Sequence, residues 1–216
     1  MNQGAINTLL AARAIADHAL NQGVLVSDSE PRGVCLHMGA VLADSILQAG
    51  LNYSNVVRPR IEAILRNHPE ASTVSALVPI LNSGRAGEFL GWSHMEKIQR
   101  FIRLVEFLDM QGVDSVFDLR QRLMLPLFGV EMQSLNGVGP KTVDYMGCLV
   151  GIESIAVDRH VRSFARAAGL VNEEYDYLKK SFCFAADLLS LPRREFDAWL
   201  WRRAAQSEVV QMSLAI

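Results

Sequence analysis

Two residues that could perform chemistry together lie in the stretch from Leu135 to Gly169. One is Lys141, whose amine can act as a nucleophile toward a carbon centre when it is uncharged. The other is Asp158, whose carboxylate can stabilise a positively charged sugar while a glycosidic bond breaks. The pair therefore predicts chemistry at a carbon centre, in which the amine could form a bond and the carboxylate could stabilise positive charge.

Lys141 follows a Gly-Val-Gly turn and a proline that opens a helix. Gly137 and Gly139 can adopt positive φ, so the backbone N–H groups around Val138 can face a phosphate at the positive end of the helix dipole. The same potential disfavours a cation and increases the neutral fraction of the amine. Two alternatives are a turn that only connects two helices and a lysine that only contacts a phosphate.

Asp158 follows three apolar residues in the sequence IAVDRHV. A helix from Lys141 to Val150 rises about 15 Å, and the seven residues after it can return about 23 Å if they are extended. Asp158 can therefore lie at the level of Lys141. Its alternative role is to cap the next helix, and a capping carboxylate can also serve catalysis.

These segments, LNGVGPKT and AVDRHV, resemble the helix-hairpin-helix and Gly/Pro/Asp signature of the endonuclease III superfamily of DNA glycosylases. The resemblance implies that Lys141 attacks the sugar C1′ and that Asp158 assists. It implies a base excision repair glycosylase with AP lyase activity, which flips a damaged or mismatched base out of duplex DNA and excises it through a Schiff base.

The resemblance also implies an all-α, two-lobed fold with the active-site cleft between the lobes. Residues 35–152 would form a six-helix lobe that ends in the helix-hairpin-helix. Residues 1–34 and 153–216 would form a second helical lobe that carries Asp158.

Apolar spacing supports helices throughout the chain, with Phe101, Leu104, Val105 and Leu108 on one stripe. We expect about ten helices and no strand hairpin. Ser93 and Glu96 have the spacing of a capping box, and Leu81–Gly91 is predicted as a loop. Helix ends are predicted at four glycines: Gly50, Gly112, Gly151 and Gly169.

Further DNA contacts are predicted outside the turn. Arg159 and Arg162 could meet phosphates beside the target, although a solvated helix face is the alternative. Gln48, in ILQAGLNYSN, resembles the polar wedge that fills the gap left by an extruded base. Asn52 and Tyr53 are the neighbouring alternatives, and an ordinary helix position explains Gln48 equally well.

Composition limits the cofactors and the mode of DNA binding. Cys35, Cys148 and Cys183 are widely spaced and the C-terminal residues hold no cysteine, so we expect buried thiols and neither an iron-sulfur cluster nor a metal site. A monovalent cation could bind the hairpin carbonyls. The net charge is −2, so any DNA site must be a local basic patch.

Two other functions remain open at this point. One is a monofunctional glycosylase that activates water through Asp158, and the other is a non-catalytic helix-hairpin-helix module that grips the DNA backbone. No apolar run is long enough to span a bilayer, so we expect a soluble intracellular protein, in the cytoplasm or nucleoid, without a membrane partner. The resemblance implies that it acts as a monomer. The sequence does not indicate which base is excised.

Overall fold

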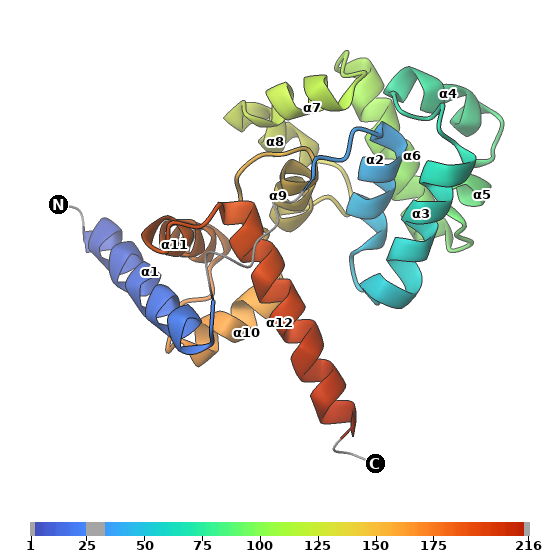
Figure 1. Cartoon of the computed structure of the whole chain (residues 1–216). Coiled ribbons are helices and arrows are strands. Elements are labelled where there is room, and N and C mark those ends of the chain that lie inside the picture. Colours follow the sequence, from blue (N-terminus) through green and yellow to red (C-terminus); the bar gives the residue numbers. More distant parts are fainter. Residues whose placement is uncertain (1–2, 25–32, 214–216) are drawn as a thin grey trace. The chain divides into compact units, whose positions relative to one another are not determined.

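The computed structural model describes residues 3–24 and 33–213, with side chains as far as residue 204. This part of the chain forms helices and no strand, which confirms the predicted all-α class. Contacts divide the chain into a central unit, residues 34–152, and a terminal unit, residues 1–33 and 153–216. The positions of the two units relative to one another are not determined, so each is described by itself (Figure 1). The predicted cleft between two lobes stays a prediction.

The central unit consists of short helices joined by tight turns. Most helices have eight to sixteen residues, and α5 has five. In chain order they are α2 (Met38–Leu47), the π-helix η2 (Tyr53–Val57), α3 (Arg58–Asn67), α4 (Val74–Asn82), α5 (Ala86–Leu90), α6 (Met95–Met110), α7 (Val116–Leu123), α8 (Pro126–Met132) and α9 (Pro140–Leu149).

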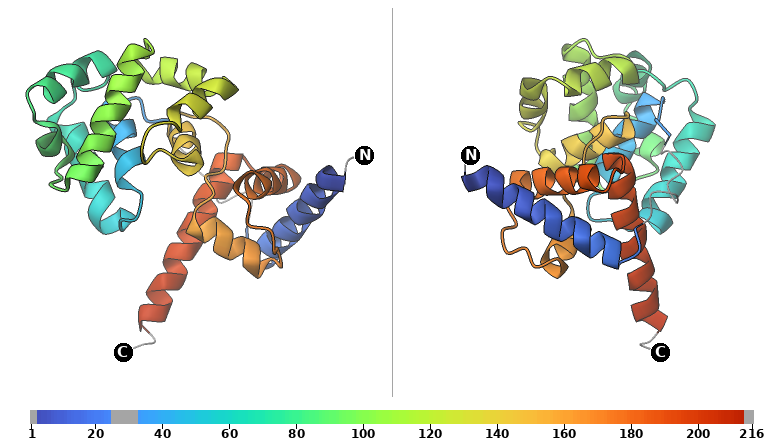
Figure 2. Two further views of the ribbon diagram at one scale, coloured as in Figure 1. Left: turned by 180° about the vertical axis from the view of Figure 1, so that it is seen from behind. Right: turned by 60° about the vertical axis from the view of Figure 1, so that its left-hand side comes forward.

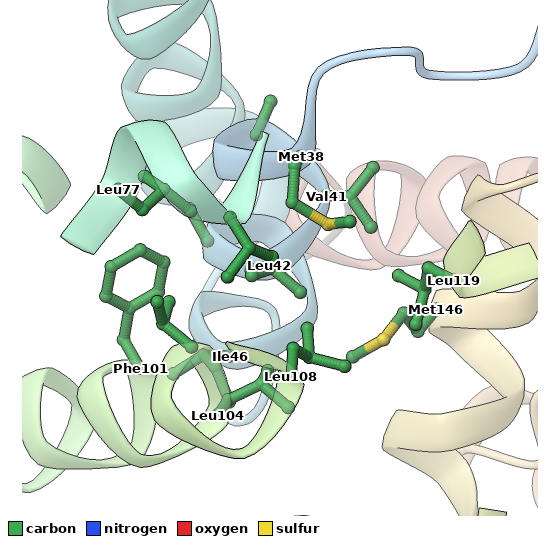
Figure 3. Packing of buried hydrophobic residues seen from close by; sticks show 14 of the residues in the cluster. Met38, Val41, Leu42, Ile46, Leu77, Phe101, Leu104, Leu108, Leu119 and Met146 are labelled. Atoms are coloured by element: carbon green, nitrogen blue, oxygen red, sulfur yellow. The ribbon is translucent and has the colours of Figure 1, made fainter. Parts of the chain in front are cut away.

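Helix α2 forms the axis of the central unit. All ten of its residues are buried, and it packs against α3, α4, α6 and α9. Figure 3 shows its apolar side chains in one cluster with those of α4, α6 and α9, among them Met38, Leu42, Leu77, Leu104 and Met146. A helix that is apolar on all sides is stable only in such a core. The neighbours of α2 are therefore fixed by its burial.

The terminal unit contains α1 (Gln3–Asn21), α10 (Arg159–Ala167), α11 (Tyr175–Leu188) and α12 (Arg193–Ser213). Helix α1 lies along α11, as both views of Figure 2 show, and α12 packs against α10 and α11. Its core includes Phe182 and Phe196, and Trp199 stacks on Phe196 with ring centroids 5.9 Å apart. None of the described helices is both long enough and apolar enough to cross a membrane.

Several predicted helix boundaries are confirmed and others are wrong. Gly112, Gly151 and Gly169 follow helix ends with φ of 65°, 87° and 86°, as the C-terminal signal requires. The predicted capping box at Ser93 is wrong, because His94 is the N-cap of α6 and makes no side-chain cap. Part of the predicted loop 81–91 is instead α5, because burial of its Phe89 and Leu90 holds this segment against α6.

Truncation of the α6 stripe tests this core. Leu104 is fully buried in the α2–α6 cluster, so Leu104→Ala should lower the free energy of unfolding by about 2–5 kcal/mol. Met110, 78% exposed at the end of the same helix, provides the control, and Met110→Ala should change stability by less than about 0.5 kcal/mol. Urea denaturation followed by circular dichroism measures both, and equal effects would contradict the assigned core.

Candidate active site at the hairpin turn

The predicted Gly-Val-Gly turn lies between α8 and α9 in the central unit. Gly137 has φ of +83°, which an L side chain rarely adopts, whereas Gly139 is the N-cap of α9 with φ of −102°. Pro140 occupies the first turn, where its missing N–H costs nothing. Lys141 therefore follows at the second position of α9, at the positive end of the helix dipole.

The three residues of the turn differ in what they can offer a ligand. Val138 is only 3% exposed, and its amide donates to the carbonyl of Leu135 at 3.0 Å. Within the described part of the chain, no acceptor is found for the backbone N–H of Gly137 or of Gly139. Val138 therefore anchors the turn in the core, and the two glycine amides are the donors that could meet a phosphate.

Arg100 of α6 lies directly over the turn, which the sequence analysis missed. A Cβ atom at Gly137 would overlap the guanidinium group of Arg100. Arg100 forms an ion pair with Glu96, and its buried Nε has no hydrogen-bond partner among the described residues. Glycine is therefore required at position 137 both for its φ and for the space that Arg100 fills. A cation thus lies beside Gly137.

Lys141 and Gln48, two candidates 93 residues apart in the sequence, come together. The Nζ of Lys141 donates to the Oε1 of Gln48 at 2.6 Å. Gln48 is the C-cap of α2, so the end of the buried helix meets the start of α9 at this bond. The wedge role of Gln48 stays a prediction, but its amide oxygen also holds the candidate nucleophile in place.

Lys97, which no sequence signal identified, stabilises the other side of the same turn. Its Nζ donates to the carbonyls of Ile46 and Ala49 at 3.0 and 2.7 Å, on both sides of Gln48. Burial lowers the pKa of Lys97, and the charges of Arg100 and Lys141 lower it further, while Glu96 opposes them. Lys97 therefore lies close enough to Lys141 for their charges to repel.

A buried carboxylate lies one helical turn before Gln48 on α2. Asp44 is 4% exposed and accepts hydrogen bonds from the phenols of Tyr53 and Tyr145, at 3.0 and 3.1 Å. Tyr145 is one turn after Lys141 on α9. No local sequence pattern identified Asp44, because Tyr145 lies 101 residues later in the chain and Tyr53 belongs to a π-helix. The two helices are thus joined by two polar pairs, Gln48 with Lys141 and Asp44 with Tyr145.

Asp158 belongs to the terminal unit, where it caps α10. Its Oδ1 accepts from the amides of His160 and Val161 at 2.8 and 3.0 Å, so the capping role considered for it is confirmed. Arg159 is exposed, whereas Arg162 bonds to the carbonyl of Glu173. The two predicted arginines therefore differ, and Arg159 is the one with an exposed side chain.

None of the three cysteines forms a disulfide bond. Cys148 and Cys183 are buried and Cys35 is partly buried. Burial raises the pKa of Cys35, a backbone hydrogen bond to His37 opposes this, and the charge of Asp44 raises it further. Among the residues described, no group of three or more His, Cys, Asp or Glu side chains is placed to hold a metal ion.

The fold matches that of a solved DNA glycosylase. The crystal structure of the 3-methyladenine DNA glycosylase (MagIII) of H. pylori bound to 1,N6-ethenoadenine superposes with a TM-score of 0.59. The match covers 93% of this chain and 98% of that chain, at 17% sequence identity. The chain has the helix-hairpin-helix DNA glycosylase fold. This confirms the fold implied by the sequence resemblance. No family model and no curated protein matches the sequence.

Two glycine substitutions test the geometry of the hairpin. Gly137→Ala places a Cβ in a left-handed conformation and against Arg100, so it should destabilise the protein by more than about 2 kcal/mol. Gly139→Ala is the matched control, because its φ is ordinary and no atom lies within 4 Å of the new Cβ. It should cost less than about 1 kcal/mol. Chemical denaturation compares them, and a Gly137→Ala protein as stable as Gly139→Ala would refute this geometry.

Proposed function

We propose that this chain is a base excision DNA glycosylase with AP lyase activity. It extrudes a damaged base from duplex DNA, and the amine of Lys141 attacks the sugar C1′ to form a Schiff base that eliminates the 3′ phosphate. The observation that carries this proposal is the position of Lys141. In a chain with the DNA glycosylase fold, it follows the Gly-Val-Gly turn after one proline, and its amine donates to Gln48 at 2.6 Å.

The DNA backbone would be gripped at the hairpin. The amides of Gly137 and Gly139 offer two donors at the start of α9, and Arg100 supplies positive charge beside Gly137. Arg159 would add a phosphate contact, whereas Arg162 would first have to leave Glu173. This local group of cations lets a chain of net charge −2 bind a polyanion as a monomer.

Asp158 would act on the sugar. Two backbone amides fix its carboxylate at the start of α10, so its orientation is set before substrate arrives. The carboxylate would stabilise the positive charge that develops on the sugar and accept a proton during elimination. The solved neighbour is named for 3-methyladenine and holds ethenoadenine, which supports an altered purine as the substrate to test first.

A second function is favoured by the same bond between Lys141 and Gln48. An amine that donates to an amide oxygen is well placed for a binding role, and the protein would then be a monofunctional glycosylase that activates water through Asp158. The two functions give different products, since only the lyase nicks the strand. A non-catalytic DNA-binding module would leave both the base and the strand intact.

Borohydride trapping tests the role of Lys141. With a duplex that carries one abasic site, the wild-type protein should form a covalent adduct, and Lys141→Ala should form none because no amine reaches C1′. Binding of the same duplex should fall by less than about tenfold, since the hairpin amides remain.

Lys180, exposed on α11, provides the control, and Lys180→Ala should trap as the wild type does. Full trapping by Lys141→Ala would reject it as the nucleophile. Base loss from lesion duplexes without any wild-type adduct would establish the monofunctional enzyme, and binding without base loss would establish the passive grip.

Two substitutions at Asp158 separate its chemistry from its capping role. Asn caps helices about as well as Asp, so Asp158→Asn should keep the melting temperature while excision slows by about 10²-fold or more. Asp158→Ala should lose a similar rate and also about 1 kcal/mol of stability. Single-turnover excision and thermal melting are the measurements. An Asp158→Asn enzyme with the wild-type rate would contradict a catalytic role and show that Asp158 only caps α10.

A further inference from the structure

Two lysine amines bind the same turn at the end of α2. Lys97 of α6 donates to the carbonyls of Ile46 and Ala49 at 3.0 and 2.7 Å. Lys141 of α9 donates at 2.6 Å to the side chain of Gln48, which lies between those two residues in the sequence. Both lysines are partly buried. Two like charges are therefore brought together where solvent and salt screen them incompletely.

The charges of the two lysines act on one another. Burial is the main cause that lowers the pKa of Lys97, and the positive charges of Arg100 and Lys141 lower it further, while Glu96 opposes them. A Coulomb interaction is mutual, so the charge of Lys97 disfavours an ammonium group at Lys141 in the same way. The two titrations are thus coupled, and the neutral form of one amine favours the charged form of the other.

The two helices at this turn decide which amine keeps its proton. The carbonyls that bind Lys97 lie at the C-terminal end of α2, where the helix dipole and two acceptors favour a cation. Lys141 is instead at the second position of α9, where the dipole of that helix disfavours a cation. Lys97 is therefore the amine that stays charged, and Lys141 is the one that more readily becomes neutral.

We propose that Lys97 is a positioning residue that acts through Lys141: its charge, fixed by two backbone carbonyls, disfavours a charge on Lys141 and so increases the neutral fraction of that amine. This inference rests on the proposed lyase activity, because only a neutral amine has the lone pair that bonds to C1′. At an abasic site the amine adds to the C1′ aldehyde and water leaves, so an imine remains, and borohydride then transfers hydride to that carbon. Lys97 takes no part in these bonds and sets only how much of the amine is ready to react.

Other ionisable groups surround the two lysines and stay in place when only Lys97 is changed. On α6, Glu96 pairs with Arg100, whose guanidinium group lies over Gly137. The remaining groups are Asp44 of α2 with its phenol partners Tyr53 and Tyr145, and Asp144, three residues after Lys141 on α9. Ionised carboxyl groups among them favour a charged amine and so oppose Lys97. Because all variants at position 97 share these groups, a comparison of such variants isolates the effect of Lys97.

Acetylation of Lys141 by acetic anhydride, measured by mass spectrometry, tests this inference without DNA, because the anhydride reacts with the neutral amine and releases acetate. Lys97→Met removes the charge but keeps a long side chain, so labelling of Lys141 at about pH 7 should fall at least about threefold. The difference should narrow toward about pH 10, where lysines in general begin to lose their charge. Lys97→Arg retains the charge, so its Lys141 should be labelled within about twofold of the wild type.

Exposed side chains provide the controls. Arg103→Met removes a cation from an exposed position on α6 and should leave the labelling of Lys141 unchanged. Lys180, exposed on α11 and labelled in the same sample, should react alike in all the proteins. Thermal melting of each variant reports folding. Lys97→Gln keeps a hydrogen-bond donor without the charge, and it replaces Lys97→Met if that variant melts below the assay temperature.

Borohydride trapping at a preformed abasic site distinguishes this inference from the lyase function itself. At about pH 7, Lys97→Met should trap at least about threefold more slowly than the wild type, and the difference should narrow with rising pH as it does for labelling. A wild-type protein that traps no abasic site contradicts the lyase function. Labelling of Lys141 that is unchanged in Lys97→Met, or reduced by the same factor at every pH, overturns the role of Lys97, because a purely structural contact would have the second effect.

Discussion

The burial of α2 is the constraint on which the rest of the central unit depends. A ten-residue helix with every side chain buried must be covered on all sides, and α3, α4, α6 and α9 provide this cover. Two of these helices, α6 and α9, carry the cations of the site. Because the core fixes how α6 and α9 meet α2, it also fixes where Arg100, Lys97 and Lys141 lie. The site is thus a consequence of packing as much as of local sequence.

A buried helix can carry polar groups only if each is paired, and α2 meets this condition in ways that also build the site. Ser45 donates to the carbonyl of Val41, which satisfies it within the helix. Asp44 is satisfied from outside by two phenols, and Lys97 donates to the carbonyl of Ile46 in the last turn and to that of Ala49 just after the helix. The last carbonyls of a helix have no partner within the helix, and burying them without one is unfavourable. Here Lys97 donates to carbonyls on both sides of Gln48 and so stabilises the turn in which Gln48 lies.

Much of the fold and part of the site could be predicted from the sequence, because those features rest on local chemistry. The glycine stops, the proline in the first turn of α9 and the Asp158 cap all follow from backbone rules that act over a few residues. The all-α class follows from apolar spacing together with the signature at the hairpin.

What could not be predicted depends on contacts between distant segments. The position of Arg100 over the turn could not be predicted, because it depends on the space that Gly137 leaves for its side chain. Asp44 precedes Tyr145 by 101 residues, and no local pattern pairs them. The wrong helix start at Ser93 has a different, local cause, since Glu96 pairs with Arg100 one turn later in the same helix instead of closing a capping box. Contacts between distant segments therefore explain the missed residues, and a local ion pair explains the wrong boundary.

The concentration of basic groups near the hairpin explains why a net charge of −2 is compatible with the proposed DNA binding. The basic groups of the hairpin site are concentrated, since Lys97, Arg100 and Lys141 all lie at the α2–α9 end of the central unit. Their mutual repulsion is relieved by carbonyls, by Glu96 and by the amide of Gln48. Phosphate contacts would relieve it further, because an anion neutralises several of these cations at once. The repulsion among these cations thus favours an anionic ligand at this end of the central unit.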